Sequence, residues 1–303
     1  MACTFGILQC THPTPTAPPG PCARTSIAGQ RLPHVLPEQL NAQYWIARST
    51  DVDRVWLDQT AIQHWNRYLA SPQSGVPLFD LQNIDPTVIK IAVQRRLNYL
   101  EKQLLSKQYI FPLPLREMPA LSLPDDWLTQ ISPTFFTSTG LVTLHCFPIQ
   151  HRILKTKDPQ QLNRNLCSTA GPGETLQVLG KWPNGMLLAR TYYVLGWISP
   201  HAPMIPADPS LVQDIASRPT LSLSRRRWLT RAFELMNHPY GWGGEHGGLD
   251  CSSFVMEVFK PYGLLLPRHS GHQARALPYS VDVPHTATDS ERFFQLHFGA
   301  RCG

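Results

Sequence analysis

Cys251 combines a nucleophilic side chain with a sequence context that exposes it. Apolar residues recur at helical spacing after this cysteine: Phe254, Val255, Val258 and Phe259. This spacing predicts a short helix from residue 251 to about residue 260, ended by Pro261. Free backbone N–H groups and the positive end of the helix dipole stabilise a thiolate in a first helical turn. The pattern therefore predicts a nucleophilic cysteine.

A glycine-rich run precedes the cysteine, with five glycines between Tyr240 and Asp250. Glycine adopts backbone conformations and permits close approaches that residues with a Cβ resist. We therefore expect a cleft lined by backbone, open to a substrate. The competing interpretation is a buried structural thiol, which is common for free cysteine. The glycine run, with Asp250 before the cysteine and Ser252 after it, favours the interpretation of Cys251 as a nucleophile.

Three motifs follow one another in the last third of the chain. They are Tyr240-x-Trp-Gly-Gly, Asp250-Cys-Ser-x-Phe254 and Leu266-Pro-Arg-x-Ser-x-x-Gln273. Together they resemble the signature of the NlpC family of bacterial cell-wall cysteine peptidases. The resemblance implies a papain-like α+β domain that cleaves peptidoglycan stem peptides next to γ-D-glutamate, without metal or cofactor. It assigns Cys251 as the nucleophile and implies a substrate pocket lined by Tyr240, Asp250, Ser252 and Ser270.

The family also requires a histidine base downstream of the nucleophile. His269 and His272 fall inside the third motif, and His285 lies in a polar stretch typical of a solvated loop. We take His297 as the candidate base because His-Phe-Gly-Ala is similar to a family strand with the pattern His-x-Gly. The alternative is that the tail is unrelated sequence, from a shifted reading frame or a truncated gene, and holds no base. No third triad residue is identified.

Residues 224–303 are fewer than a complete domain of this kind requires, so we expect an incomplete, C-terminally truncated papain-like domain. An incomplete sheet leaves an unpaired edge. The sequence thus predicts a cysteine peptidase by ancestry with little or no activity. The alternatives are a non-catalytic peptidoglycan-binding envelope protein and, in third place, acyl transfer by a related thiol fold.

Length and composition suit an α+β protein of two or three domains: 303 residues, 42% apolar and 16% charged. The 29 prolines favour short elements and small β domains. A net charge of +6 and a pI near 9.0 suit contact with anionic envelope polymers. Nucleic acid is not expected as a partner, because basic residues are scattered apart from Arg225, Arg226 and Arg227.

The chain is expected to fall into five segments. They are a proline-rich leader (1–36), a helical accessory domain (37–118), an SH3-like β-barrel domain (119–203), a semi-rigid linker (204–223) and the papain-like domain (224–303). Apolar spacing predicts helices over 58–69 and 86–100. Short apolar runs separated by turn residues predict strands over 141–147, 174–179, 185–190 and 193–198.

The barrel assignment comes from a resemblance to bacterial SH3-like domains. It is carried by Gly173-Glu before a valine strand, the hairpin turn Trp182-Pro-Asn-Gly185, and a closing strand that ends in Gly196-Trp-Ile. In the family such domains bind wall material or roof the active-site cleft. Tyr192 or Tyr193 then reaches the substrate, or else both tyrosines pack the barrel.

The seven cysteines show neither a Cys-x-x-Cys pair nor zinc-finger spacing, so we expect no metal site. A disulfide between Cys146 and Cys167 is expected if the compartment is oxidising. Cys10 follows a short apolar segment and resembles the lipid-attachment cysteine of a lipoprotein; the alternative is an ordinary cysteine in a leader. We expect a bacterial envelope protein, and no apolar run is long enough to predict a transmembrane segment.

Overall fold

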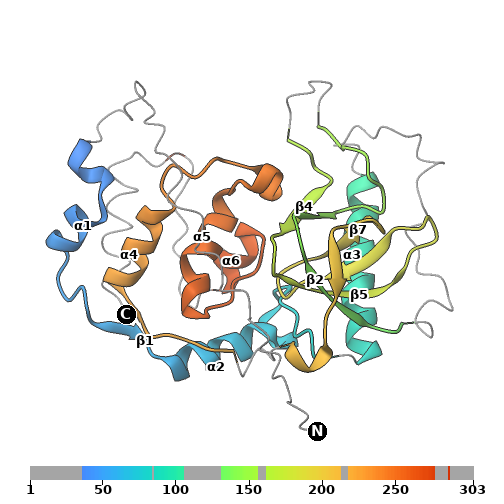
Figure 1. The fold of residues 1–303 in the computed structure, drawn as a ribbon, viewed down its shortest axis with the longest axis horizontal. Helices are drawn as coiled ribbons and strands as arrows, with labels where there is room; N and C mark the ends of the chain where they lie inside the picture. Colours follow the sequence, from blue (N-terminus) through green and yellow to red (C-terminus); the bar gives the residue numbers. More distant parts are fainter. Residues whose placement is uncertain are drawn as a thin grey trace, which may run out of the picture.

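The computed structural model describes residues 36–83, 85–105, 131–155, 162–212, 218–276 and the single residue Thr286. Its α-helices are α1 (Ala42–Arg48), α2 (Gln59–Ala70), α3 (Pro86–Leu105), α4 (Arg225–Glu234), α5 (Cys251–Phe259) and α6 (Ser270–Ala276). Its 3-10 helices are η1 (Pro37–Leu40), η2 (Pro72–Ser74), η5 (Pro209–Leu211), η6 (Trp242–Gly247) and η7 (Lys260–Tyr262). Figure 1 shows α3 and most strands at one end of the molecule, α1, α4, α5 and α6 at the other, and α2 between them.

The strands form two antiparallel sheets, so the α+β class predicted from the sequence is confirmed. They are β1 (Val55–Leu57), β2 (Thr134–Ser138), β3 (Val142–His145), β4 (Leu166–Ala170), β5 (Thr175–Lys181), β6 (Leu187–Arg190), β7 (Leu195–Ile198), β8 (Met204–Pro206) and β9 (Leu223–Ser224). β1 pairs with β9, and the other seven follow the order β4-β3-β7-β6-β5-β2-β8. No pairing joins β4 to β8 within the described residues, so the expected closed barrel is not seen there.

The four predicted apolar runs correspond to β3, β5, β6 and β7. The sequence did not indicate β2, β4 or β8. Strand β4 reads Leu-Cys-Ser-Thr-Ala, whose alternate residues are buried although Ser168 and Thr169 are polar and Ala170 is small. Strand β8 lies in the segment 204–223 that was expected to be a linker, and it pairs with β2. The sheet therefore extends past residue 203.

The N-terminal helices begin where the sequence places them, but they pack against different elements of the fold. Helix α2 starts after Asp58, whose side chain accepts a hydrogen bond from the Ala61 N–H at 2.8 Å. Its buried Asn66 binds the C-terminal region, donating to the Gly263 carbonyl at 2.7 Å and accepting from the Leu265 N–H at 2.9 Å. Helix α3 instead buries one face against the large sheet. Within the described residues, α2 and α3 therefore share their cores with the C-terminal region and the large sheet.

One hydrophobic core continues from the sheet to the C-terminal helices. Its buried members come from α2, the sheet, α5 and the segment after η7, and include Leu69, Val142, Leu144, Met256, Leu265 and Leu266. Burial of such side chains stabilises the fold by about 1.5–3 kcal/mol each. Because one core serves all these elements, the sheet and the region around Cys251 are held together.

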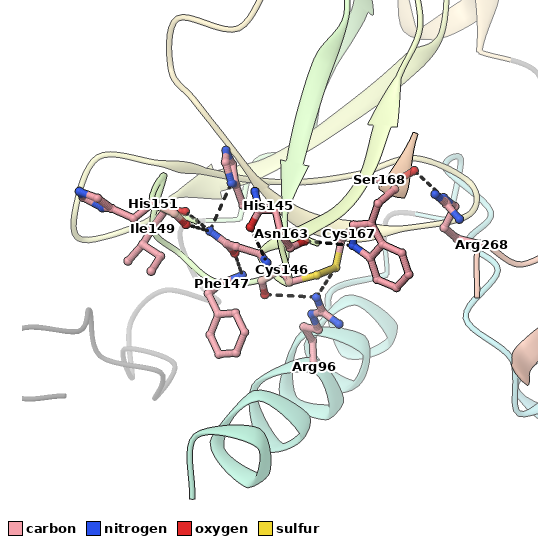
Figure 2. Close-up of a disulfide and its surroundings, with 12 residues drawn as sticks. Arg96, His145, Cys146, Phe147, Ile149, His151, Asn163, Cys167, Ser168 and Arg268 are labelled. Atoms are coloured by element: carbon pink, nitrogen blue, oxygen red, sulfur yellow. Dashed lines mark hydrogen bonds between the residues drawn. A yellow bond between two sulfur atoms is a disulfide. The ribbon is translucent and has the colours of Figure 1, made fainter. Parts of the chain in front are cut away.

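The predicted disulfide between Cys146 and Cys167 is present and is confirmed. It joins the residue after β3 to β4, as Figure 2 shows. Arg96 of α3 lies beneath it and donates hydrogen bonds to the Cys146 carbonyl at 3.2 Å and to the Cys167 Sγ at 2.6 Å. Burial lowers the pKa of Arg96 to about 10. The disulfide and Arg96 thus stabilise the edge of the sheet that β4 forms.

Candidate active site

Cys251 is the first residue of α5, and its thiol is free and exposed. The helix begins there because Asp250 and Ser253 form a reciprocal capping box. The Ser253 N–H donates to Asp250 Oδ1 at 2.9 Å, and the Asp250 N–H donates to Ser253 Oγ at 2.8 Å. Such a box satisfies two N–H groups that the helix itself leaves unpaired. The local sequence therefore fixes the helix start and with it the place of the sulfur.

The Asp250 carboxylate is buried and surrounded by donors. Arg268 approaches it with both terminal nitrogens, Nη1 at 3.0 Å from Oδ1 and Nη2 at 2.6 Å from Oδ2. The Gly243 N–H adds a bond to Oδ2 at 2.9 Å. Burial by itself raises the pKa of Asp250, but the hydrogen bonds and charge of Arg268, helped by the backbone N–H groups, hold it well below the ordinary value of 3.8. Asp250 is therefore a carboxylate at neutral pH.

Ser252 belongs to the same buried cluster. Its Oγ donates to Asp250 Oδ1 at 3.1 Å and accepts from Arg268 Nη1 at 2.8 Å. Gln273 of α6 donates to the Ser252 carbonyl at 2.9 Å. The second and third sequence motifs therefore fold onto one another. Asp250 and Ser252, expected to line a substrate pocket, turn their side chains toward Arg268 instead of toward solvent.

Two of the expected pocket residues are exposed. Tyr240 is 64% exposed. Its residual desolvation raises the pKa of its hydroxyl, and the charges of Asp250 and Cys251 add to the effect. Ser270 is exposed at the first position of α6. Tyr240 and Ser270 are thus accessible from solvent, in contrast to Asp250 and Ser252.

The structure brings no base to the thiol within the described residues, where no histidine forms a hydrogen bond with Cys251. The rings of His269 and His272 lie 5.4 Å apart, centre to centre. Burial, with smaller effects of Arg275 and His269, lowers the pKa of His272 to about 4, so this ring is neutral at pH 7. His297, the candidate base from the sequence, lies outside the described residues.

The glycine run packs against the edge of the large sheet. Gly243 and Gly244 are buried with φ of 65° and 91°. A Cβ on Gly243 would lie 2.6 Å from Leu166 Cγ, and one on Gly244 would lie 2.0 Å from Thr169 Oγ1. Both positions therefore require glycine. At these two positions the close partner is β4, not the substrate that the sequence led us to expect.

Further contacts tie the same loop to the sheet. The Thr169 hydroxyl donates to the Gly244 carbonyl at 3.3 Å, and Trp242 Nε1 donates to the Asn163 carbonyl at 3.0 Å. The Arg164 guanidinium lies over the Trp242 ring at 4.6 Å. An exposed strand edge invites pairing with other chains, and here the loop covers it. The loop before the nucleophile is consequently shaped by β4.

Tyr192 and Tyr193 are buried and pack within the fold. The Tyr193 hydroxyl donates to Glu174 Oε2 at 2.8 Å and to the Thr169 carbonyl at 3.0 Å. Glu174 also pairs with Lys260, just after α5, at 2.9 Å. Of the two interpretations of these tyrosines, packing is the one that the structure supports.

Neither a metal-binding cluster nor a membrane-spanning helix is found among the described residues. In the described ranges, no three His, Cys, Asp or Glu side chains gather in a way that would bind a metal ion. None of the described helices has the length and apolarity needed to cross a bilayer.

Comparisons with known proteins locate the similarity around this site. Residues 237–291 match the NlpC/P60 family. A γ-D-glutamyl-L-lysine dipeptidyl-peptidase of Bacillus subtilis (strain 168) is 51% identical over 39 residues, 12% of this chain and 13% of that protein. The enzyme with the same name from Bacillus cereus (strain ATCC 10987 / NRS 248) is 40% identical over 57 residues, 18% of this chain and 17% of that protein. The matched part thus spans less than a fifth of either relative.

Among solved structures, an NlpC/P60 endopeptidase from Photobacterium damselae subsp. piscicida is similar with a TM-score of 0.41 and 13% identity. The match covers 74% of this chain and 67% of that one. A likeness at this level does not establish a shared fold.

Proposed function

We propose that this chain, whose residues 237–291 are an NlpC/P60 family segment, is a cysteine peptidase that cuts peptidoglycan stem peptides beside γ-D-glutamate. One observation carries the proposal: the only free thiol in the described residues is exposed at the first position of α5, inside the matched segment. The names of the two Bacillus relatives supply the bond class, γ-D-glutamyl-L-lysine.

The chemistry follows from the placement of Cys251. Its thiolate attacks the amide carbon of the γ-D-glutamyl bond, and the C–N bond breaks as the leaving amine takes a proton. Water then hydrolyses the thioester. The backbone N–H groups of Cys251 and Ser252 have no hydrogen-bond acceptor among the described residues, so they are available to the developing oxyanion. We assign the base that moves the proton to His297.

The substrate contacts are divided between exposed and buried members of the site. Tyr240 and Ser270 are accessible, and we assign them to contact with the stem peptide. Asp250 and Ser252 are buried and bonded to Arg268, which supports a role in shaping the start of α5. The pocket that the resemblance implied is thereby reduced to its exposed residues.

The setting of the peptidase is part of the same proposal. We assign strands β2 to β7 to an SH3-like module within residues 119–203 and the region 224–303 to a papain-like domain. The disulfide supports work outside the cytoplasm, since disulfides persist in oxidising compartments. The net charge of +6 suits anionic envelope polymers. Cys10, the candidate lipid-attachment site, lies outside the described residues.

The test is incubation of the purified, oxidised protein with the tripeptide L-Ala-γ-D-Glu-L-Lys, followed by mass spectrometry. We expect release of L-Lys, loss of activity in Cys251→Ala, and no cleavage of the matched peptide with an α-linked D-Glu. If the wild-type protein binds insoluble peptidoglycan but does not cleave the tripeptide, the proposal is overturned in favour of a non-catalytic wall-binding protein. The expectation of an inactive chain rests on the missing third triad residue and on the short region 224–303; release of L-Lys that Cys251→Ala abolishes would contradict that expectation.

The base is tested by a matched pair of substitutions in the tail. His297→Ala should abolish cleavage, whereas His285→Ala should leave it unchanged because the polar sequence around His285 predicts a solvated loop histidine with no part in catalysis. Equal activity of the two variants contradicts the assignment of His297.

A further inference from the structure

Arg268 is a buried arginine that uses all three of its nitrogens at the start of the nucleophile helix. Nη1 donates to Asp250 Oδ1 at 3.0 Å and to Ser252 Oγ at 2.8 Å, and Nη2 donates to Asp250 Oδ2 at 2.6 Å. The remaining Nε donates to Ser168 Oγ on β4 at 2.9 Å. Figure 2 shows this last bond, with Arg268 pointing toward Ser168. One guanidinium therefore joins three segments far apart in the sequence.

The geometry requires arginine. A guanidinium presents its donors as a rigid planar fork that binds both oxygens of a carboxylate and leaves Nε facing sideways. Here the fork holds Asp250, and Nε reaches the sheet. Lysine keeps the charge but offers a single point of donation. It can pair with Asp250 or reach Ser168, but it cannot reproduce the whole arrangement.

Strand β4 is fixed on both sides of the residue that Arg268 contacts. Cys167, just before Ser168, is bridged to Cys146, and Thr169, just after it, binds the Gly244 carbonyl. Ser168 is itself buried. The acceptor for Arg268 Nε is therefore held in place by the disulfide and by the loop contact.

We infer that Arg268 is a positioning residue, which holds the Asp250 cap and the first turn bearing Cys251 in a fixed place against Ser168 of the sheet. This inference deepens the proposed function, since it rests on Cys251 as the nucleophile. The sheet then sets the geometry of the nucleophile through one side chain. The sheet therefore has a role at the active site in addition to any contact with the cell wall.

The test measures the thiol directly, without a substrate. The rate of Cys251 alkylation by iodoacetamide is followed by peptide mass mapping for the wild type and Arg268→Gln. The variant leaves the carboxylate of Asp250, the residue before Cys251 in the sequence, without its arginine partner, so the rate at pH 7 should fall about three- to tenfold. Arg275→Gln, an exposed arginine on α6, is the matched control and should alkylate at the wild-type rate.

The pH profile distinguishes positioning from simple support of the fold. Without Arg268, only the hydrogen bonds to Asp250 from its other neighbours, including the Ser253 and Gly243 N–H groups, oppose the rise in its pKa that burial causes, so the alkylation profile of Arg268→Gln should gain a transition on its acid side. Tyr240, whose hydroxyl pKa responds to the charges of Asp250 and Cys251, is unchanged in this variant. Arg268→Lys should recover part of the rate and lose the added transition.

Coupling to the sheet is tested with Ser168→Ala. This variant should lower the alkylation rate less than Arg268→Gln does, and it should add nothing to Arg268→Gln, because Ser168 acts through Arg268. A wild-type rate and profile in folded Arg268→Gln, or full additivity of the two substitutions, overturns the inference. If Arg268→Gln does not fold, the inference is tested with Arg268→Lys and Ser168→Ala, and wild-type alkylation rates in both of these variants overturn it. Failure of the wild type to cut the tripeptide contradicts the proposed function but does not affect the interpretation of these alkylation rates.

Discussion

Replacing Gly244 by alanine should weaken the junction between the nucleophile loop and the sheet. Gly244 has φ of 91°, and an added Cβ would lie 2.0 Å from Thr169 Oγ1. A side chain at positive φ costs about 1–2 kcal/mol. Forcing the Thr169 side chain away costs about 1–3 kcal/mol more. We therefore expect Gly244→Ala to lower the free energy of unfolding by about 2–5 kcal/mol.

The two contributions can be separated with controls from the same loop. Gly247 has φ of 76° and nothing within 4 Å of its added Cβ, so Gly247→Ala should show only the backbone strain, about 1–2 kcal/mol. Combining Gly244→Ala with Thr169→Ala removes the clashing oxygen and leaves the Thr169 Cβ at 3.2 Å. The double variant should therefore be more stable than Gly244→Ala alone, although it lacks the Thr169 hydrogen bond.

The assay is urea unfolding at neutral pH with the disulfide intact, followed by tryptophan fluorescence and circular dichroism. The reasoning is refuted if Gly244→Ala loses no more stability than Gly247→Ala. It is also refuted if Thr169→Ala destabilises the Gly244→Ala protein as much as it destabilises the wild type.

Three further outcomes are expected from urea unfolding. The paired change Cys146→Ser and Cys167→Ser opens a loop with a sequence separation of 21 and should lower the free energy of unfolding by about 3 kcal/mol, while added dithiothreitol should have no effect on that variant. The pKa of Asp250 is lower in the folded protein than its ordinary 3.8, so its pairing stabilises the fold above about pH 4, and this stability is lost as the pH falls. The free energy of unfolding of Asp250→Asn should therefore fall less steeply in acid than that of the wild type. Equal dependence on pH in the two proteins would contradict this. Tyr193→Phe removes a hydroxyl bonded to Glu174 and Thr169 and should cost about 1–3 kcal/mol, with kcat/KM on the tripeptide unchanged if the ring only packs.

Local chemistry made the helices and the nucleophile predictable from the sequence. The helix after Asp250 was predicted to begin at Cys251 and does so, because a capping carboxylate and an apolar spacing act over a few residues. Helices α2 and α3 begin within a residue of their predicted starts for the same reason. Four apolar strands were equally plain. Strand β4 was missed because its polar sequence gives no alternating apolar signal, although its burial alternates.

The candidate site was only partly predictable. The resemblance named Cys251, Tyr240, Asp250, Ser252 and Ser270, but it gave no sign that Asp250 and Ser252 face Arg268. An arginine placed after an Asp-Cys-Ser motif was the available signal, since a buried carboxylate requires a cation. His297 stays a prediction, because it lies outside the described residues.

Caps and apolar periodicity act over a few residues, so they were enough to locate the nucleophile and the start of its helix along the chain. The contacts that hold that helix in place became visible only in the folded protein. The partners of Arg268 lie on β4 and α5, and Gly243 and Gly244 are glycines because β4 packs against them. Such contacts depend on the folding of distant segments onto one core, which no spacing along the chain encodes.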